Sequence, residues 1–136
     1  MPATKWWLST KTAMRGVVYV ALGGALGAVC RYGISLLPYK GAFPVLTLAT
    51  NLLGAMLIGF LAGLITTIRA PSDEAMLFWK TGVCGGFTTF STFSLEAVQL
   101  FQKGKIGSGA LYIAFSVIGC LLGVLAGMWL AKRVCR

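Results

Sequence analysis

The feature that most limits the fold of this chain is a series of four long apolar segments joined by short polar connections. Their residue numbers are 16–37, 43–68, 75–102 and 106–131. Each exceeds the roughly 20 residues that an α-helix needs to cross a bilayer. Because only 11% of the residues are charged, too few polar side chains are available to cover a water-facing surface. The sequence predicts an all-α integral membrane protein, with a polar basic tail at 1–15 and one four-helix transmembrane domain at 16–133.

Positive charge is concentrated at the ends of the apolar segments. The net charge of +9 would by itself be compatible with nucleic-acid binding. The basic residues, however, border the segments or lie in the tails, as they do in membrane proteins beside lipid headgroups. Eight fall on the side of the termini and four on the other side, which favours cytoplasmic termini. We therefore expect membrane lipid, and no nucleic acid, as a partner.

The residues of ordinary enzyme and metal sites are scarce. Histidine is absent, which removes the commonest general base and metal ligand. The four cysteines lie at positions 30, 84, 120 and 135 without a close Cys-x-x-Cys spacing, and we interpret them as small buried hydrophobic residues. The sequence therefore predicts no enzyme.

The third segment contains an interruption, residues 82–94, that a lipid-facing helix should avoid. It has three glycines, five hydroxyl residues and three phenylalanines. Gly85 and Gly86 weaken helix continuity, and Thr and Ser side chains can satisfy main-chain groups that a break would free. Non-helical backbone at membrane depth is tolerated only where protein or a cavity covers it. We therefore expect a broken third helix whose carbonyls and hydroxyls face an ion path.

Small residues recur at four-residue spacing in the other three segments. These residues are Gly23 and Gly27; Ala55, Gly59 and Gly63; and Gly119, Gly123 and Gly127. Helices in lipid associate through such faces because their backbones can approach closely. We interpret all three as packing faces.

Two features of the sequence could contact an anion. Asn51 lies about a third of the way into the second segment, where polar groups are costly, and its amide supplies two donors; an interhelical hydrogen bond is the alternative. Phe90 and Phe93 lie three residues apart and share a helix face. Their positive ring edges could hold an anion, whereas core packing is the ordinary role of such a pair. The residues alone leave both alternatives open.

Other polar residues could extend such a path. A hydroxyl-lined track would be formed by Ser91, Thr92, Tyr112 and Ser116, and Cys120 continues the face of the last two. We expect Glu96 to orient hydroxyls rather than line the narrowest point, because an unpaired carboxylate would repel an anion. Arg31 either attracts anions into a vestibule or extends to the headgroups.

Three motifs occur in order along the chain: GGALGAVCRY at 23–32, TLATNLLG at 47–54 and GGFTTFSTFS at 85–94, the last followed by Glu96. Together they resemble the small bacterial fluoride channels, the Fluc/CrcB family, over residues 16 to 133. The third motif is highly specific, whereas the glycine-rich first motif alone would be weak. Family members usually have Ser where Cys120 stands here.

The resemblance implies a passive fluoride-selective channel in the inner (plasma) membrane that relieves fluoride toxicity. It implies an antiparallel homodimer of chains, with one sodium ion held by the main-chain carbonyls of Gly85 and Thr88. Phe90 and Phe93 would line the pore, and Arg31 would lie near its entrance. The complete expected pathway is Arg31, Asn51, Phe90, Ser91, Thr92, Phe93, Glu96, Tyr112 and Ser116.

Three other classes of membrane protein compete with this interpretation. A proton-coupled exporter of organic cations needs a carboxylate deep in an early helix, and the first two segments have none. A membrane-embedded enzyme needs an acidic pair or a nucleophile with its base. A scaffold subunit without transport would leave the broken third segment unexplained.

Overall fold

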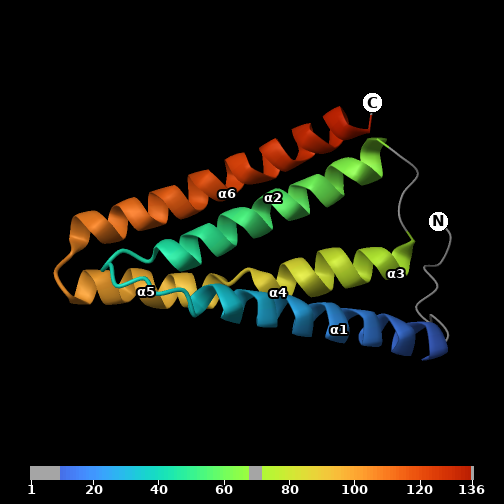
Figure 1. Cartoon of the computed structure of the whole chain (residues 1–136), viewed down its shortest axis with the longest axis horizontal. Coiled ribbons are helices and arrows are strands. Elements are labelled where there is room, and N and C mark those ends of the chain that lie inside the picture. The colour runs from blue at the N-terminus through green and yellow to red at the C-terminus, as the bar shows by residue number, and fades with distance from the viewer. Residues whose placement is uncertain (1–9, 68–71, 136) are drawn as a thin grey trace, which may run out of the picture.

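Three of the four apolar segments form single long helices. They are α1 (Thr10–Ser35), α2 (Val45–Thr67) and α6 (Ile106–Val134). In the computed structural model, which describes residues 10–67 and 72–135, all three are long and apolar enough to cross a membrane. The start of α1 and the end of α6 lie at the same end of the bundle (Figure 1). Helix α1 begins inside the expected tail; residues 1–9 of that tail, and loop residues 68–71, lie outside the described residues.

The third segment is a series of shorter helices, which confirms the predicted all-α fold with a broken third helix. In chain order they are α3 (Asp73–Met76), the π-helix η1 (Leu77–Cys84), α4 (Gly85–Phe87) and α5 (Phe90–Gln102). Between α4 and α5 the backbone is extended at Thr88 (φ −80°, ψ 156°) and at Thr89 (φ −148°, ψ 112°). The sequence did not predict the π-helix, a form that is frequent at functional sites.

The break falls at the two threonines and not at the two glycines before them. β-Branched threonine favours extended backbone, and each hydroxyl here forms a hydrogen bond with a main-chain group. The Thr88 hydroxyl donates to the Cys84 carbonyl at 2.9 Å, and the Thr89 hydroxyl caps α5 by accepting from the Thr92 N–H at 3.2 Å. Gly86 stays helical and lies against α1, where an added Cβ would collide with the Gly24 carbonyl.

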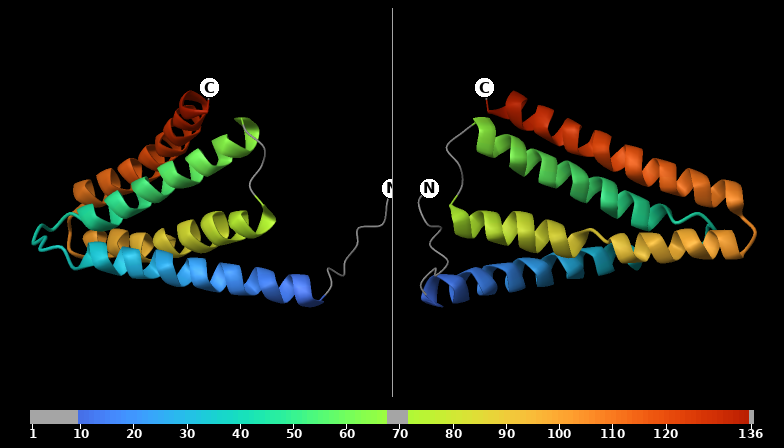
Figure 2. Two further views of the ribbon diagram at one scale, coloured as in Figure 1. Left: turned by 45° about the vertical axis from the view of Figure 1, so that its right-hand side comes forward. Right: turned by 180° about the vertical axis from the view of Figure 1, so that it is seen from behind.

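The helices associate as two pairs. Helix α2 packs chiefly against α6, and α1 packs chiefly against η1 and α4. The two pairs meet at α5 and diverge toward the chain ends (Figures 1 and 2). Small residues form the contacts, as the four-residue spacing predicted: a Cβ on Gly127 would collide with the Met56 carbonyl, and a Cβ on Gly23 with the Phe78 carbonyl.

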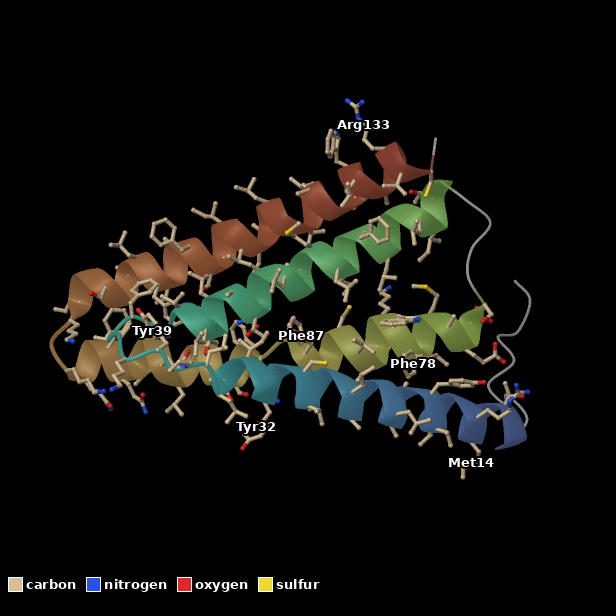
Figure 3. The ribbon with its side chains drawn as sticks, in the orientation of Figure 1. Met14, Tyr32, Tyr39, Phe78, Phe87 and Arg133 are labelled. Atoms are coloured by element: carbon tan, nitrogen blue, oxygen red, sulfur yellow. The ribbon has the colours of Figure 1, made fainter. Side chains whose placement is uncertain are left out.

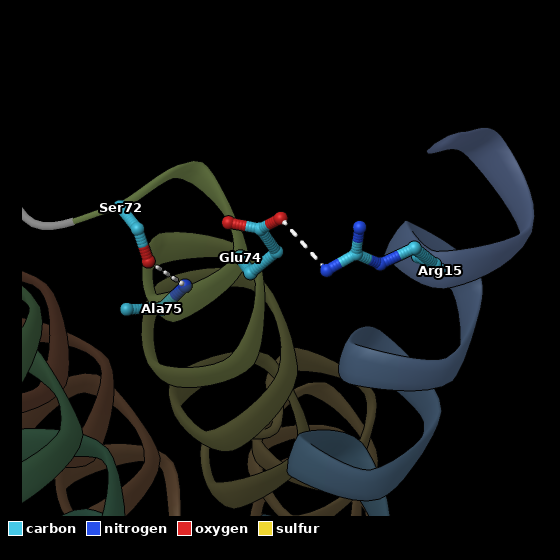
Figure 4. Close-up of polar contacts among 4 residues, drawn as sticks. All are labelled: Arg15, Ser72, Glu74 and Ala75. Carbon is cyan, nitrogen blue, oxygen red and sulfur yellow. Dashed lines mark hydrogen bonds and ion pairs between the residues drawn. The ribbon is translucent and has the colours of Figure 1, made fainter. Parts of the chain in front are cut away.

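The start of the third segment is fixed by local polar contacts. The Ser72 hydroxyl caps α3 by accepting from the Ala75 N–H at 3.2 Å. Asp73 and Glu74 occupy the first turn, where acidic side chains are favourable to the helix dipole. Glu74 also forms a 3.5 Å ion pair with Arg15 of α1 (Figure 4). At this end of the molecule one ion pair therefore joins α1 to α3.

Most large apolar side chains lie on the outside of the bundle. Met14 and Tyr32 point away from it (Figure 3) and are 60% and 63% exposed. Buried hydrophobic residues are few, and one cluster of them lies between α5 and α6: Phe93, Ala97, Leu100 and Tyr112. An apolar exterior over a small core is what a helix bundle in lipid requires, since lipid tails are as apolar as the side chains.

Candidate functional site

A cavity of about 590 Å³ lies beside the break, and α2, η1, α5 and α6 contribute to its wall. Its hydroxyl and amide groups come from Asn51, Thr81, Thr88, Thr89 and Ser116, and its thiols from Cys84 and Cys120. Phe90 and Phe93 supply aromatic rings, and Lys80 is the one charged side chain among the residues that line it. A concave, mainly apolar space with a few convergent polar groups is typical of a small-ligand or ion site.

Asn51 holds the broken backbone through both ends of its amide. Its Nδ2 donates to the Thr89 carbonyl at 3.1 Å, and its Oδ1 accepts from the Thr89 N–H at 2.8 Å. In a continuous helix that N–H would bond the carbonyl of Gly85 instead. Asn51 therefore replaces the helical partner of Thr89, and its second Nδ2 proton stays available in the wall of the cavity.

The break leaves two carbonyls, those of Gly85 in α4 and of Thr88 just after it, without their usual donors. The N–H groups of Thr89 and Thr92 would satisfy Gly85 and Thr88 in a continuous helix, but they donate to Asn51 and to the Thr89 hydroxyl. Arg31 donates from its Nε to the neighbouring Gly86 carbonyl at 3.2 Å.

Gly85 and Thr88 both line the cavity, and no atom lies within 4 Å of a Cβ built on Gly85. Their carbonyls are hard oxygen groups at the wall of this cavity, so the residues fit a small cation bound by main-chain oxygen. Among the described residues, no cluster of His, Cys, Asp or Glu side chains could hold a metal ion.

The two phenylalanines differ sharply in burial. Phe90 is 78% exposed at the edge of the cavity, whereas Phe93 is 8% exposed and belongs to the buried cluster. Their ring centroids are 5.4 Å apart, and Phe93 also contacts the Tyr112 ring at 5.2 Å. The three rings form a continuous row from the cavity into the protein.

This row ends at the carboxylate of Glu96. The Tyr112 hydroxyl donates to Glu96 Oε2 at 2.7 Å, and the Thr47 hydroxyl donates to Oε1 at 2.9 Å. Thr47 and Glu96 also line a second cavity of about 280 Å³, together with Lys103 and Lys105. The row of rings thus connects the two cavities.

The hydroxyl group of Ser116 in α6 lines the first cavity, whereas those of Ser91 and Thr92 lie at the start of α5. Ser116 is 6% exposed, lines the first cavity, and its hydroxyl has no hydrogen-bond partner in the described part of the chain. Such a buried hydroxyl needs a partner from the cavity itself. Ser91 and Thr92 lie within 3.4 Å and 3.0 Å of the Thr89 hydroxyl and form a cluster at the start of α5.

Most of the residues predicted from sequence line one of these two cavities, and four do not. Asn51, Phe90, Phe93 and Ser116 line the first cavity with Gly85 and Thr88, and Glu96 lines the second. Neither cavity is lined by Arg31, which bonds the Gly86 carbonyl, by Ser91 and Thr92, which cluster at the Thr89 hydroxyl, or by Tyr112, which bonds Glu96.

Sequence reasoning missed three residues. Thr47 precedes Asn51 by four residues and so shares its helix face, a signal that could have found it. Lys80 was treated only as an end-of-segment charge, and Thr89 only as part of the motif. The cysteines were expected to be buried: Cys84 is buried, and Cys30 is exposed.

Comparison with known proteins places this chain beside one group. Residues 18–128 match the family model described as "CrcB-like protein, Camphor Resistance (CrcB)". A protein of Ruminiclostridium cellulolyticum named "Fluoride-specific ion channel FluC" is 48% identical over 124 residues, which cover 89% of this chain and 95% of that protein.

Two further relatives carry the same name. The Rhizobium meliloti protein is 46% identical and the Agrobacterium fabrum protein 44% identical, each over 124 residues that cover 89% of this chain and 99% of the relative. The similarity therefore extends over nearly the whole of both chains, with all three motifs inside it.

Proposed function

The chain belongs to the CrcB family, and from this premise we propose that it is a passive, fluoride-selective ion channel. The relatives named for this activity are matched over nearly their full lengths. One observation carries the proposal: the cavity beside the break has two phenylalanine rings, an amide donor and an unpartnered hydroxyl in its wall, and the residues that line it include no carboxylate.

Neutral donors suit conduction of a small anion. The second amide proton of Asn51, the hydroxyl of Ser116 and the edges of Phe90 and Phe93 can together replace part of the water around fluoride. The start of α5 borders the same cavity, and a helix N-terminus carries partial positive charge. Several weak contacts let an ion enter and leave, whereas one strong contact would trap it.

The route that we propose runs along the row of rings. From the first cavity it passes Phe93 and Tyr112 to Glu96 and the second cavity. Both carboxylate oxygens of Glu96 accept hydroxyl protons, so Glu96 sets the direction in which Thr47 and Tyr112 point. The lysines at positions 103 and 105 border this second cavity and favour an anion there.

We also propose one sodium ion bound by the carbonyls of Gly85 and Thr88. When bound, it would offset the cost of bringing anions into a region of low dielectric constant. The support is that the helical donors of both carbonyls are used elsewhere. A ligand of the folded state raises stability with its concentration. After dialysis into a sodium-free buffer, the unfolding midpoint should rise with added sodium and not with a large organic cation; no difference would contradict the site.

The functional unit that we propose is an antiparallel homodimer. A subunit alone leaves Phe90 largely exposed and the first cavity open, and a second copy would cover both. A single cysteine placed at the exposed Gln102, in a variant without native cysteines, should react with an impermeant thiol reagent from both sides of the membrane. Reaction from one side only would contradict the antiparallel arrangement.

The role that follows is relief of fluoride toxicity at the plasma membrane. Fluoride enters cells as neutral HF and ionises inside, and a passive channel lets the anion leave. The activity involves no chemical conversion, so we propose that the protein is not an enzyme. All three acidic residues of the sequence lie at or after position 73, which leaves no carboxylate in α1 or α2 for a proton-coupled exporter.

Fluoride efflux from liposomes that contain only this protein tests the function directly. A fluoride electrode should record rapid efflux down the gradient without any proton gradient, and chloride efflux under the same conditions should be negligible. Chloride efflux as fast as fluoride efflux would refute selectivity, and strict dependence on a proton gradient would refute passive conduction.

A further inference from the structure

Lys80 occupies an unusual position for a charged residue. It lies in η1, seven residues after the start of α3, which is roughly 10 Å along the helix at 1.5 Å per residue. Ionisable residues at such a depth face a cavity or a partner group and mark ion paths. Lys80 lines the first cavity with Asn51 and Phe90, so its charge belongs to the space in which we place the anion.

No acidic group in the described part of the chain balances this charge. Of the three described carboxylates, Glu74 pairs with Arg15, and Glu96 accepts from Thr47 and Tyr112. Asp73 is in the exposed first turn of α3, about two helical turns from Lys80. The side chains three and four residues from Lys80 are Met76, Leu77, Val83 and Cys84, and all are uncharged.

The chemistry of an ammonium group suits attraction at a distance. Lysine carries a strongly hydrated charge on a flexible stem, and an exposed lysine such as this one keeps its water and does not bind an anion tightly. A cavity with one sign of charge and low-dielectric walls raises the local concentration of the opposite ion. This attraction weakens with salt, since the screening length falls from about 10 Å at 0.1 M to about 3 Å at 1 M.

We propose that the ammonium group of Lys80 is the charge that draws fluoride into the first cavity, and that it makes conduction depend on ionic strength. The inference rests on the proposed fluoride channel and assigns different residues to short-range contact with the ion and to its attraction from a distance. Asn51, Ser116 and the phenylalanine rings contact the ion at short range, and Lys80 sets how often an ion arrives.

Fluoride efflux of matched variants at two ionic strengths tests the assignment. The variants are Lys80→Met, Lys80→Gln, Lys80→Arg and, as the control, Lys132→Met, which removes an equal charge from the exposed end of α6 outside the cavity. Fluoride is kept below saturation, and ionic strength is raised with a salt of a large impermeant anion. Size-exclusion chromatography confirms that each variant is assembled.

The expected result has a specific pattern. Lys80→Met and Lys80→Gln should conduct about tenfold more slowly than the unmodified protein at low ionic strength, and the difference should disappear at high ionic strength. Lys80→Arg and Lys132→Met should behave as the unmodified protein. An equal rate in all variants, or a reduction by the same factor at both ionic strengths, would overturn the role of Lys80 while fluoride conduction stands. Absence of efflux from the unmodified protein would refute the channel itself.

Discussion

Asn51 offers the sharpest test of how the break is held. Replacement of Asn51 by leucine, a side chain of similar size, removes both hydrogen bonds to Thr89. The Thr89 carbonyl keeps the first hydrogen bond of α5, because an N-cap residue supplies it, but the Thr89 N–H is left unpaired in an apolar bundle. The unpaired donor costs about 1–3 kcal/mol and the second lost bond about 0.5–1.5 kcal/mol. We therefore expect the free energy of unfolding to fall by about 1.5–4.5 kcal/mol.

Thr50, the residue directly before Asn51, supplies the matched control. Thr50 lies in the same helix, is 2% exposed, and donates its hydroxyl to the Leu46 carbonyl at 2.8 Å. Thr50→Val removes that bond at nearly constant shape, and the carbonyl keeps its helical donor, so the loss should stay below about 1.5 kcal/mol. Unfolding by sodium dodecyl sulfate in mixed micelles measures both variants, and fluoride efflux is recorded at a temperature at which both are folded.

The combination of stability and efflux separates the possible roles of Asn51. If the amide holds the break, Asn51→Leu should be less stable than Thr50→Val and should conduct poorly. Equal stability of the two variants would refute the structural role. Lost efflux together with full stability would mean that the amide acts only on the ion, and normal efflux in Asn51→Leu would remove it from the pathway altogether.

Three further predictions use the same measurements. Gly127→Ala should lower the free energy of unfolding by about 1–3 kcal/mol because its Cβ collides with α2, whereas Gly107→Ala, with no atom within 4 Å of its Cβ, should not; similar losses would refute the close packing. Tyr112→Phe removes a hydrogen bond to a carboxylate and should lower the free energy of unfolding by about 1.5–3 kcal/mol and also lower fluoride efflux. Unchanged stability and unchanged efflux would contradict the role of the Tyr112–Glu96 bond. Phe93→Ala should lower the free energy of unfolding by about 3–5 kcal/mol, because the ring is buried. Phe90→Ile should stay folded while fluoride efflux falls about tenfold, as expected for the loss of roughly 1.4 kcal/mol of ring–anion attraction. Normal efflux in folded Phe90→Ile would exclude that ring from the pore.

The hydropathy of the chain was enough to predict the number of segments, and the glycines and hydroxyl residues at 82–94 predicted the break in the third. Four apolar stretches with short connections allow few arrangements in lipid, and the four-residue glycine spacing marked the contact faces. The residues at which the helix breaks could not be predicted from the sequence. Gly85 and Gly86 looked like helix breakers, yet Gly86 is a point of contact with α1, and sequence alone does not distinguish glycine that breaks a helix from glycine that admits a neighbour.

Several residues that line the cavities, among them Asn51, Phe90 and Phe93, could be predicted from the motifs, but their hydrogen-bond partners could not. The amide of Asn51 was expected to offer donors to an anion, whereas one of its protons is already given to Thr89. Arg31 was placed at an entrance, and it bonds the Gly86 carbonyl. Hydrogen-bond partners depend on the rotation and depth of each helix, which tertiary packing sets and periodicity does not contain.

The distribution of hydrogen bonds is itself an argument for function. Five described side-chain hydrogen bonds join residues 16 or more positions apart, and every one of them ends on a residue between positions 86 and 96. Polar bonds that served only to hold helices together would be spread along α1, α2 and α6, where small residues already provide the contacts. Three of these bonds lie at the interruption itself, on Gly86 and Thr89, so the protein stabilises a local break in an otherwise apolar bundle. Such a break lowers helix stability, so its benefit has to come from the groups that it turns toward the cavity.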